Sequence, residues 1–210
     1  MNLEEKYTQV RDTPTDINEH VPTLYKYSKE CQSVLELGVR SAVSSFAFIK
    51  GLTDNDLGRR VLVSCDVNPV TSEENRRLIN KYCTKYNIDY TFLLKNDLEI
   101  TSEEVSNIDL TFIDTWHVYG QLKRELEKFS KITNKYIILH DTTVDEIYGE
   151  TIRCSMDANQ QSKLSGYPIE EILRGLWPAV TEFLQNNDDW YLKERYTNNN
   201  GLTVLARKTI

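Results

Sequence analysis

The feature that most constrains the fold is a repeated alternation of short apolar runs with helix-like segments. Most of these runs are continuously apolar, which is typical of strands buried on both faces of a parallel sheet. Strands that alternate with helices along a chain form one sheet between two helix layers. We therefore predict an α/β fold, a three-layer α/β/α sandwich. The runs that we interpret as parallel strands are 33–37, 61–65, 89–94, 108–113 and 135–139.

The helices are predicted from the spacing of apolar side chains and from capping signals. A Ser, Thr or Asp followed three residues later by Glu can satisfy free N–H groups of a first helical turn. This pattern begins at Asp16, Thr71 and Thr101, whereas residues 1–15 are polar and end in a loop signal. The predicted helices are 16–30, 44–52, 71–86, a short one from 101, 118–130 and 168–184.

The C-terminal part predicts an antiparallel addition to the sheet. Residues 190–196 and 202–206 have strand character, and Asn200-Gly201 between them is a strong hairpin signal. We expect a mostly parallel seven-stranded sheet with an antiparallel C-terminal hairpin strand. The whole chain is interpreted as a single domain, with residues 1–32 as an N-terminal helical segment and residues 143–167 as an active-site flap.

Composition and charge argue against several classes of function. The formal net charge is −7, so a basic groove for a phosphate backbone is not expected. No apolar run approaches the roughly 20 residues of a membrane span, and the N-terminus lacks an apolar signal segment. The four cysteines form neither a CxxC pair nor a zinc-spaced set with histidine. We expect a cytoplasmic protein with no nucleic-acid partner and no membrane span.

The residues that follow the first two strands are candidates for a ligand site, because open α/β sheets bind ligands beyond the carboxyl ends of their strands. Gly38 permits a tight turn and a close approach of a ligand to the backbone. Asp66 stands where a carboxylate can accept two hydrogen bonds from a ribose diol. The dinucleotide pattern G-x-G-x-x-G is absent. This acidic end suits a positively charged ligand better than a triphosphate.

The residues after the fourth and fifth strands predict the chemistry. Only three histidines are present, and two of them, His117 and His140, stand near Asp114 and Asp141 at adjacent strand ends. Two unpaired carboxylates would repel one another, and a hard cation such as Mg²⁺, Ca²⁺ or Mn²⁺ would relieve that repulsion. A hydroxyl bound to such an ion becomes more acidic. His117, with an ordinary pKa near 6.5, could then remove its proton.

These strand-end segments resemble a known family. Asp114-Thr115-Trp116-His117 followed by Tyr119, and then His140-Asp141-Thr142, resemble the metal-dependent O-methyltransferases that act on sugar and antibiotic hydroxyls. That group includes the macrolide-sugar and rhamnosyl O-methyltransferases and the cephalosporin-hydroxylase-like family. Catechol O-methyltransferase is a more distant likeness. Further matching segments are Asp16-Ile17-Asn18-Glu19-His20, Gly175-Leu176-Trp177-Pro178 and Asn198-Asn199-Asn200-Gly201-Leu202-Thr203. The chain also resembles the methyltransferase domain of a large-virus glycan-building protein.

The resemblance implies a class I, Rossmann-like methyltransferase that uses S-adenosylmethionine (SAM) and Mg²⁺ or another divalent cation. Glu36-Leu37-Gly38 resembles its first motif, with Ala42 in place of the usual second glycine. An acidic residue at the place of Asp97 meets the adenine amino group in that class. The implied cofactor-binding residues are Glu36, Gly38, Ser41, Asp66, Asn68, Asp97 and Asp114. The implied catalytic residues are Asp114 and His117, and the implied metal ligands are Asp114, His140, Asp141 and Thr142.

One departure from the family pattern concerns the metal site. The strand-five pair of the family reads Glu-Asp or Asp-Asn, whereas this chain has His140-Asp141. One hard carboxylate ligand is therefore replaced by an imidazole or lost. Either His140 or the oxygen of Thr142 could complete the site.

The acceptor implied by the resemblance is a hydroxyl of a sugar or glycan, such as a rhamnose or another deoxyhexose. The implied assembly is a homo-oligomer or a fusion to glycosyltransferase domains, in the host cytoplasm if the protein is viral. Two alternatives stay open. One is an iron-dependent hydroxylase with a site drawn from His117, His140 and an aspartate. The other is a non-catalytic SAM-fold binding module.

Overall fold

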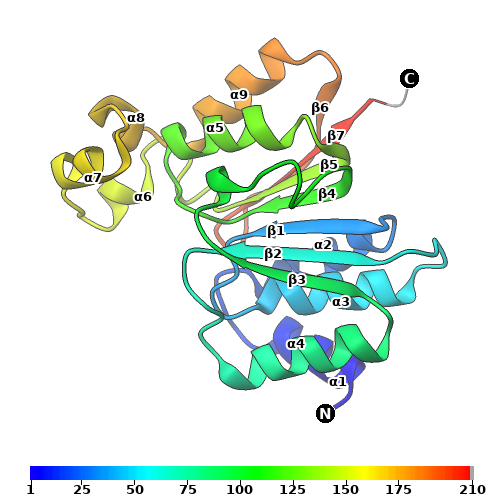
Figure 1. The fold of residues 1–210 in the computed structure, drawn as a ribbon. Coiled ribbons are helices and arrows are strands. Elements are labelled where there is room, and N and C mark those ends of the chain that lie inside the picture. The colour runs from blue at the N-terminus through cyan, green and yellow to red at the C-terminus, as the bar shows by residue number, and fades with distance from the viewer. Residues whose placement is uncertain (209–210) are drawn as a thin grey trace.

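The computed structural model describes residues 1–208, in which a seven-stranded sheet lies between two layers of helices (Figure 1). The strand order is β3-β2-β1-β4-β5-β7-β6. The first five strands in sequence are parallel, and β7 is antiparallel to both β5 and β6. This confirms the predicted sandwich and its antiparallel C-terminal hairpin. The strands are β1 (Ser33–Leu37), β2 (Val61–Asp66), β3 (Asp89–Leu94), β4 (Ile108–Ile113), β5 (Thr133–His140), β6 (Trp190–Tyr196) and β7 (Leu202–Arg207).

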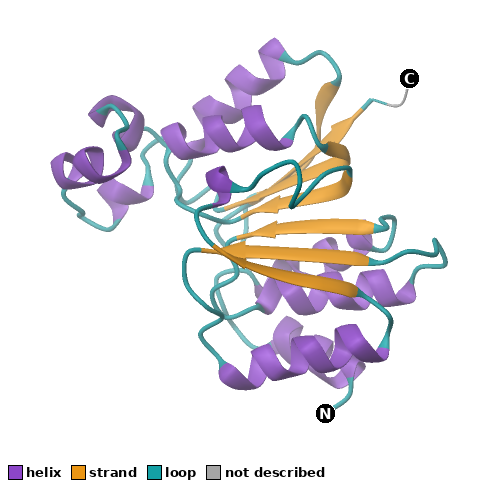
Figure 2. Ribbon diagram, viewed as in Figure 1, coloured by secondary structure: helices purple, strands orange, loops and turns teal. Residues whose placement is uncertain are grey.

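The helices cover both faces of the sheet. Figure 2 shows α1 to α4 on one face and α5 with α9 on the other. The bounds are α1 (Leu3–Asp12), α2 (Val21–Ser28), α3 (Val43–Asp54), α4 (Glu73–Lys85), α5 (Tyr119–Phe129), α6 (Glu150–Arg153), α7 (Ala158–Ser165), α8 (Ile169–Leu173) and α9 (Leu176–Asn186), with short 3-10 helices at Asn18–His20 and Asp97–Glu99.

The two helix layers bury separate apolar cores, and the sheet contributes to both. Val34 and Leu35 are neighbours on β1 and both are fully buried, but Val34 packs into the core under α3 and Leu35 into the core under α5. Successive side chains of a strand point to opposite faces. A strand covered on both faces is therefore apolar at most positions, which explains the nearly continuous apolar runs of the sequence.

The structure departs from the predicted helices at three points. No separate helix was predicted over the polar residues 1–15 of the N-terminal helical segment, but α1 forms there, starts at a capping box between Asn2 and Glu5, and buries Leu3, Tyr7 and Val10. No helix forms from Thr101. Glu104 still accepts a hydrogen bond from the Thr101 N–H at 2.8 Å. The residues between this capping pair and β4 form only turns.

The third difference lies in the predicted helix 168–184, which is split into α8 and α9 at Gly175. A Cβ atom on Gly175 would lie 2.3 Å from the carbonyl oxygen of Asp145. The N–H of Leu176 donates to that same oxygen at 2.8 Å. The backbone of the 145–146 segment therefore occupies the place that a continuous helix would need.

The segment between β5 and α9 stands apart from the layers. It holds α6, α7 and α8, which lie beyond the end of the sheet toward which the parallel strands point (Figure 1). This segment includes the predicted flap 143–167. Within residues 1–208, no helix has the length and apolar character needed to cross a membrane.

Candidate active site

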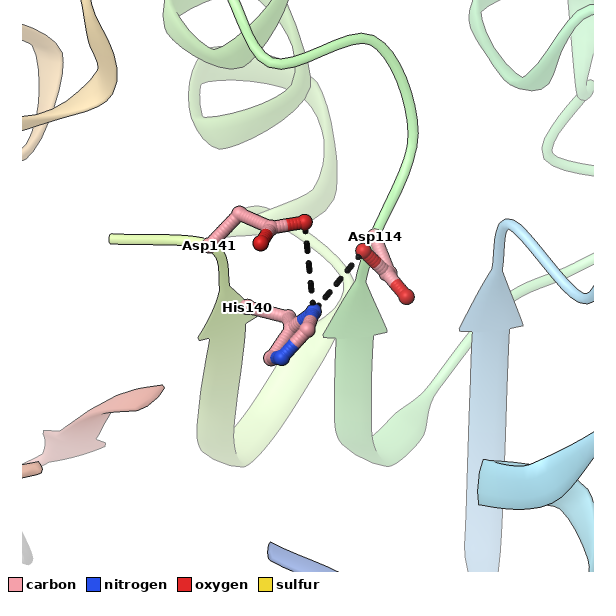
Figure 3. A group of neighbouring side chains, drawn as sticks. All are labelled: Asp114, His140 and Asp141. Carbon is pink, nitrogen blue, oxygen red and sulfur yellow. Dashed lines mark hydrogen bonds and ion pairs between the residues drawn. The ribbon is translucent and has the colours of Figure 1, made fainter. Parts of the chain in front are cut away.

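Two neighbouring parallel strands place the predicted acidic and histidine side chains side by side. Asp114 comes directly after β4, and His140 is the last residue of β5. These strands pair in parallel with Ile113 opposite Leu139, so the residues that follow lie at one edge of the sheet. Asp141 has a φ of 57°, and the chain leaves the strand there in the left-handed region. Figure 3 shows the side chains of Asp114, His140 and Asp141 grouped at this edge.

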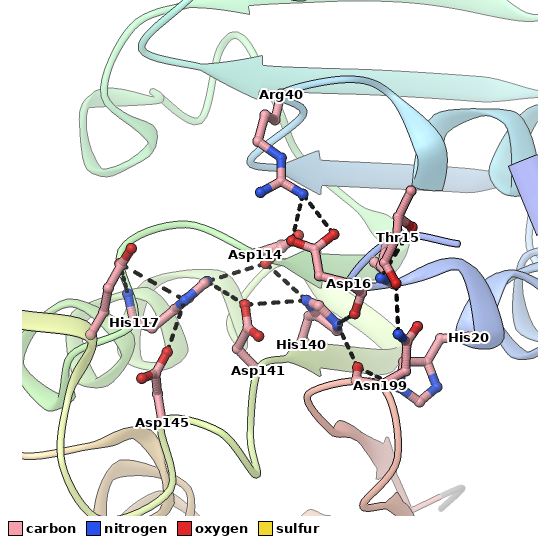
Figure 4. A network of polar contacts seen from close by, with 12 residues as sticks. Thr15, Asp16, His20, Arg40, Asp114, His117, His140, Asp141, Asp145 and Asn199 are labelled. Atoms are coloured by element: carbon pink, nitrogen blue, oxygen red, sulfur yellow. Dashed lines mark hydrogen bonds and ion pairs between the residues drawn. The ribbon is translucent and has the colours of Figure 1, made fainter. Parts of the chain in front are cut away.

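Each of two imidazole rings faces both carboxylates. His140 Nδ1 lies 3.2 Å from Asp114 Oδ1 and 3.3 Å from Asp141 Oδ2. His117 Nε2 lies 3.2 Å from Asp114 Oδ1 and 3.1 Å from Asp141 Oδ2. The structure thus brings together four predicted residues, Asp114, His117, His140 and Asp141, which we call the Asp–His cluster (Figure 4).

Other polar groups hold the two rings from behind. His140 Nε2 lies 3.1 Å from the carbonyl oxygen of Asp16 and 3.3 Å from that of Asn199. Carbonyl oxygens only accept hydrogen bonds, so Nε2 carries a hydrogen and Nδ1 is turned toward the carboxylates. His117 Nδ1 lies 3.2 Å from Asp145 Oδ2. Arg153 binds both oxygens of Asp145, at 2.7 and 2.8 Å.

The carboxylates govern the charge of both rings. Burial acts to lower the pKa of His140, but Asp114 and Asp141 outweigh it and raise the pKa to about 10. Burial likewise opposes the charge of His117, yet Asp114 and Asp145 raise its pKa well above the ordinary value. Burial acts to raise the pKa of Asp114, but His140 and His117 hold it well below its usual range. The ordinary pKa assumed for His117 from sequence is therefore not that of this site.

A cleft of about 350 Å³ opens beside the cluster, at the carboxyl ends of β1 to β4. Ligands of open α/β sheets bind at this position. Four of the predicted cofactor-binding residues line it: Gly38, Asp66, Asp97 and Asp114. The other lining residues are Cys65, Val67, Lys95, Asn96, Thr115, Trp116, Gln121 and Glu150.

Gly38 and Asp66 shape the loop at the floor of this cleft. Gly38 has a φ of 83°, and a Cβ there would lie 1.9 Å from the carbonyl oxygen of Asp114. Only glycine combines that backbone conformation with so close an approach. Asp66 Oδ2 accepts hydrogen bonds from the N–H groups of Val39 and Arg40 at 2.8 and 3.0 Å. The carboxylate thus fixes the loop while it borders the cleft.

Glu36 does not lie where the sequence prediction placed it. Its carboxylate is fully buried beneath the loop. It accepts hydrogen bonds from the hydroxyls of Ser44, Ser45 and Ser64 at 2.6 to 2.9 Å. Burial raises its pKa to about 7 despite these donors. It supports the loop from below, because its side chain points to the α3 face of the sheet rather than along the strand.

Three more predicted residues are not brought to the cleft or the cluster. Within residues 1–208, Ser41 and Asn68 are not among those that line the cleft. Thr142 is fully buried, and its hydroxyl accepts a hydrogen bond from that of Thr203 on β7 at 2.9 Å. Thr142 therefore links the segment after β5 to β7.

Sequence reasoning missed other residues of the site. Trp116 lines the cleft and stacks on Tyr167, with ring centroids 5.9 Å apart and planes 15° from parallel. Gln121 donates from Nε2 to Asp97 Oδ1 at 3.1 Å and to Glu125 Oε1 at 2.9 Å. The spacing of Gln121 and Glu125 places them on one helix face and could have identified them. Nothing in the sequence indicated that Asp145 would reach His117.

Neither a protein-family model nor a curated protein sequence matches this chain. Solved structures do match it. A protein from Corynebacterium glutamicum is 14% identical, over 98% of this chain and 91% of that chain, with a TM-score of 0.62. An O-methyltransferase from Bacillus cereus, solved with S-adenosylhomocysteine (SAH), is 17% identical over 98% and 90%, with a TM-score of 0.58. The O-methyltransferase TomG from Streptomyces achromogenes, involved in tomaymycin synthesis and solved with SAM, is 9% identical over 99% and 89%, with a TM-score of 0.57. The chain therefore has the Rossmann-like fold of these methyltransferases, with the same antiparallel end to the sheet.

Proposed function

We propose that this protein is a SAM-dependent O-methyltransferase. The observation that carries the proposal is the position of the cleft, which holds the strand-end residues Gly38, Asp66 and Asp97 and ends at the Asp–His cluster. A ligand bound along the strand ends would present one end to that cluster. The fold and the bound SAM or SAH of the similar structures support the same assignment.

The cofactor side is formed by residues of the first three strand ends. Gly38 lets the backbone approach the ligand, and Asp66 offers a carboxylate to the ribose hydroxyls. Asp97 follows β3 at one end of the cleft, and it would accept a hydrogen bond from the adenine amino group. Trp116 offers an apolar wall. When SAM is bound, it supplies a methyl group on a positively charged sulfur.

The acceptor side is formed by the Asp–His cluster. Its carboxylates fit a divalent cation, because Asp114 and Asp141 converge and the buried Asp141 Oδ1 has no hydrogen-bond partner among residues 1–208. By resemblance that cation is Mg²⁺, held by Asp114 and Asp141 with His140 beside them. A cation bound there would make a neighbouring hydroxyl more acidic. Thr142 is bonded to β7 and is left out of this set.

His117 is the residue that we assign as general base. It takes the proton of the acceptor hydroxyl; the oxygen then forms a bond to the methyl carbon, and the carbon–sulfur bond breaks to leave SAH. A base must first be neutral, and Asp114 and Asp141, two of the carboxylates that raise the pKa of His117, are the groups a cation would occupy. The Asp145 carboxylate lies 3.2 Å from the other ring nitrogen, and its charge favours a proton on that nitrogen, which leaves Nε2 as the basic atom.

We further propose a sugar hydroxyl as the acceptor, on a rhamnose or another deoxyhexose of a glycan. The segment 143–167 lies beyond the strand ends, next to the Asp–His cluster, and carries two tyrosines suited to a sugar face. Tyr148 is exposed, whereas Tyr167 is stacked on Trp116.

Calorimetric titration with SAH, with Mg²⁺ and with EDTA, tests the cofactor assignment. We expect micromolar affinity in both conditions, since the ion belongs to the acceptor side. Asp66→Ala should weaken SAH binding by about tenfold or more through lost charge-assisted hydrogen bonds, and exposed Asp89→Ala at the other end of the sheet is its control. Asp141→Ala should abolish methyl transfer and spare SAH binding. Absence of SAH binding in the wild type would refute the proposal.

A hydroxylase is the second candidate, and one observation favours it. His117 and His140 both face Asp114, and two histidines with one carboxylate form the usual iron site of such enzymes. Iron-dependent turnover of 2-oxoglutarate, without SAH binding, would establish it in place of the methyltransferase.

A further inference from the structure

The histidine–carboxylate contacts of the Asp–His cluster are longer than the two arginine–aspartate pairs beside it, and they match surface ion pairs such as Lys135–Asp109 at 3.2 Å. Arg153 and Asp145 approach to 2.7 and 2.8 Å, and Arg40 and Asp16 to 2.6 and 2.7 Å. Charge-assisted N–H···O bonds have about these lengths. The four histidine–carboxylate contacts of the cluster are all 3.1 to 3.3 Å.

A spacing of 3.1 to 3.3 Å also suits donors arranged around a common ion. Bonds of about 2.0–2.2 Å to one ion place neighbouring donor atoms roughly 3 Å or a little more apart. Asp114, His140 and Asp141 each offer one such atom, and these atoms lie within 4.8 Å of one another. Figure 3 shows the Nδ1 atom of His140 between the two carboxylates.

The orientation of the His140 ring is fixed as a metal ligand requires. The ring is 2% exposed, and its Nε2 faces the carbonyl oxygens of Asp16 and Asn199. In the neutral ring the hydrogen therefore sits on Nε2, and the lone pair on Nδ1 points at Asp114 and Asp141. A backbone carbonyl on the far nitrogen is the usual partner that orients a metal-binding histidine.

An unpartnered oxygen is independent evidence for a ligand. Asp141 is 4% exposed, and its Oδ1 has no hydrogen-bond partner among residues 1–208. A buried carboxylate oxygen that lacks any partner is costly. A bound cation would satisfy it.

The donor types decide which cation fits. Mg²⁺ takes oxygen ligands in a strict octahedron and keeps several waters, whereas imidazole nitrogen suits zinc and the late first-row metals. We propose that Asp114, His140 and Asp141 hold a zinc or first-row transition-metal ion in preference to Mg²⁺. This inference rests on the proposed function only in taking a cation to be present at the acceptor side. The ion that we propose takes the place of the Mg²⁺ that the resemblance implies.

Cobalt titration of the metal-free protein tests the inference without SAM or any acceptor. The protein carries Cys154→Ser, because Cys154 is the exposed thiol among its cysteines. We expect one equivalent of Co²⁺ to bind with visible d–d absorption. Zn²⁺ should displace it, and Mg²⁺ in about 10³-fold excess should not. Displacement of Co²⁺ by Mg²⁺ at similar concentration, or no Co²⁺ binding at all, would overturn the inference.

Two variants attribute the preference to His140. His140→Glu replaces nitrogen with a hard oxygen donor and should lower the affinity for Co²⁺ relative to Mg²⁺ by about 10²-fold or more. Glu127→Gln is the control, because Glu127 is exposed on α5 away from the cluster. It should leave Co²⁺ binding unchanged.

The outcomes separate this inference from the proposed function. An unchanged preference in a folded His140→Glu protein, with folding checked by circular dichroism, would assign the metal to other residues. If His140→Glu does not fold, the wild-type competition still decides. SAH binding with a preference for Mg²⁺ would refute the inference and leave the methyltransferase proposal standing. Cobalt binding without SAH binding would refute the methyltransferase proposal and leave this inference standing.

Discussion

Glu36 shows how a residue beside the cleft can act on stability without touching a ligand. Burial raises its pKa from 4.5 to about 7. The folded state therefore holds a proton that the unfolded state releases between these two values. The stability that this proton contributes is fully present below pH 4.5 and is lost as pH rises through 7.

Glu36→Gln removes this titration. The free energy of unfolding of Glu36→Gln relative to wild type should rise between pH 5 and pH 8, by about 3 kcal/mol at most. Urea denaturation at several pH values measures it. Glu127→Gln, at an exposed site on α5, is the control and should show no such trend. A difference that is flat with pH would mean that Glu36 is ionised in the folded protein.

Asp97 and Glu125 form a second buried acid pair, at the wall of the cleft. Burial raises the pKa of both carboxyls; Asp97 raises the pKa of Glu125 further, whereas Glu125 acts to lower that of Asp97. Asp97 Oδ2 and Glu125 Oε2 are buried, and neither has a donor among residues 1–208. Two adjacent carboxyls that are buried and lack donors share one proton. The groups around the pair are Thr115, Gln121, Lys95, Lys128, Cys65 and Tyr167.

A proton on Glu125 would leave Asp97 free to accept a hydrogen bond from the proposed cofactor. Loss of that proton at high pH makes the two charges repel, so the affinity of the wild type for SAH should fall as pH rises. Glu125→Gln supplies a permanent N–H donor, and its affinity should be equal to that of the wild type at low pH and independent of pH. Titration calorimetry from pH 6 to pH 9 compares the two. A parallel decline in both proteins would show that Glu125 is not the titrating group.

The strands could be predicted closely from the sequence, and the reason is burial on both faces. β1, β3, β4 and β6 have the predicted bounds. The sheet edge that gathers Asp114 and His140 followed from their positions at the ends of adjacent strands. Such features depend on local pattern and on the general geometry of parallel sheets.

The rest depends on tertiary contacts that a single sequence does not encode locally. The capping pair at Thr101 forms its hydrogen bond, but the residues between it and β4 form only turns. Glu36 was placed in the cleft because it precedes Gly38, whereas strand alternation turns it to the other side. Asp145 reaches His117 only because the segment after β5 folds back along the strand ends.

Gly175 is the point where that segment meets the rest of the fold. Any side chain there would collide with the backbone of Asp145 and Glu146. Gly175→Ala should therefore displace Asp145 from His117, lowering both the thermal midpoint and kcat while sparing the affinity for SAH.

Gly58→Ala separates backbone strain from displacement of the site. Gly58 has a φ of 94°, and a Cβ atom added there would meet no other atom within 4 Å. The variant should lose about 1 kcal/mol of stability from strain and keep its kcat. Equal turnover in the Gly175→Ala and Gly58→Ala proteins would show that the position of Asp145 does not matter for catalysis.

The molecule as a whole divides into a packed sandwich and a looser segment at its functional end. Among residues 1–208, seven of the thirteen exposed large apolar side chains lie between 144 and 169. α7 buries none of its own residues. Few buried contacts mean low local stability, so this segment should open more readily than the sheet. The cleft, by contrast, takes only Glu150 from it.

Limited proteolysis should separate the two parts functionally. Lys163 is exposed on α7, and trypsin should cut there before it cuts within the sandwich, because cleavage needs local unfolding. The nicked protein should bind SAH as the intact protein does, since the cleft residues stay in place, but it should lose methyl transfer once the support of Asp145 and Arg153 is loosened. Lys163→Ala should resist the first cut and keep full activity. If SAH binding and methyl transfer were lost together on nicking, the segment after β5 would belong to the cofactor site as much as to the acceptor site.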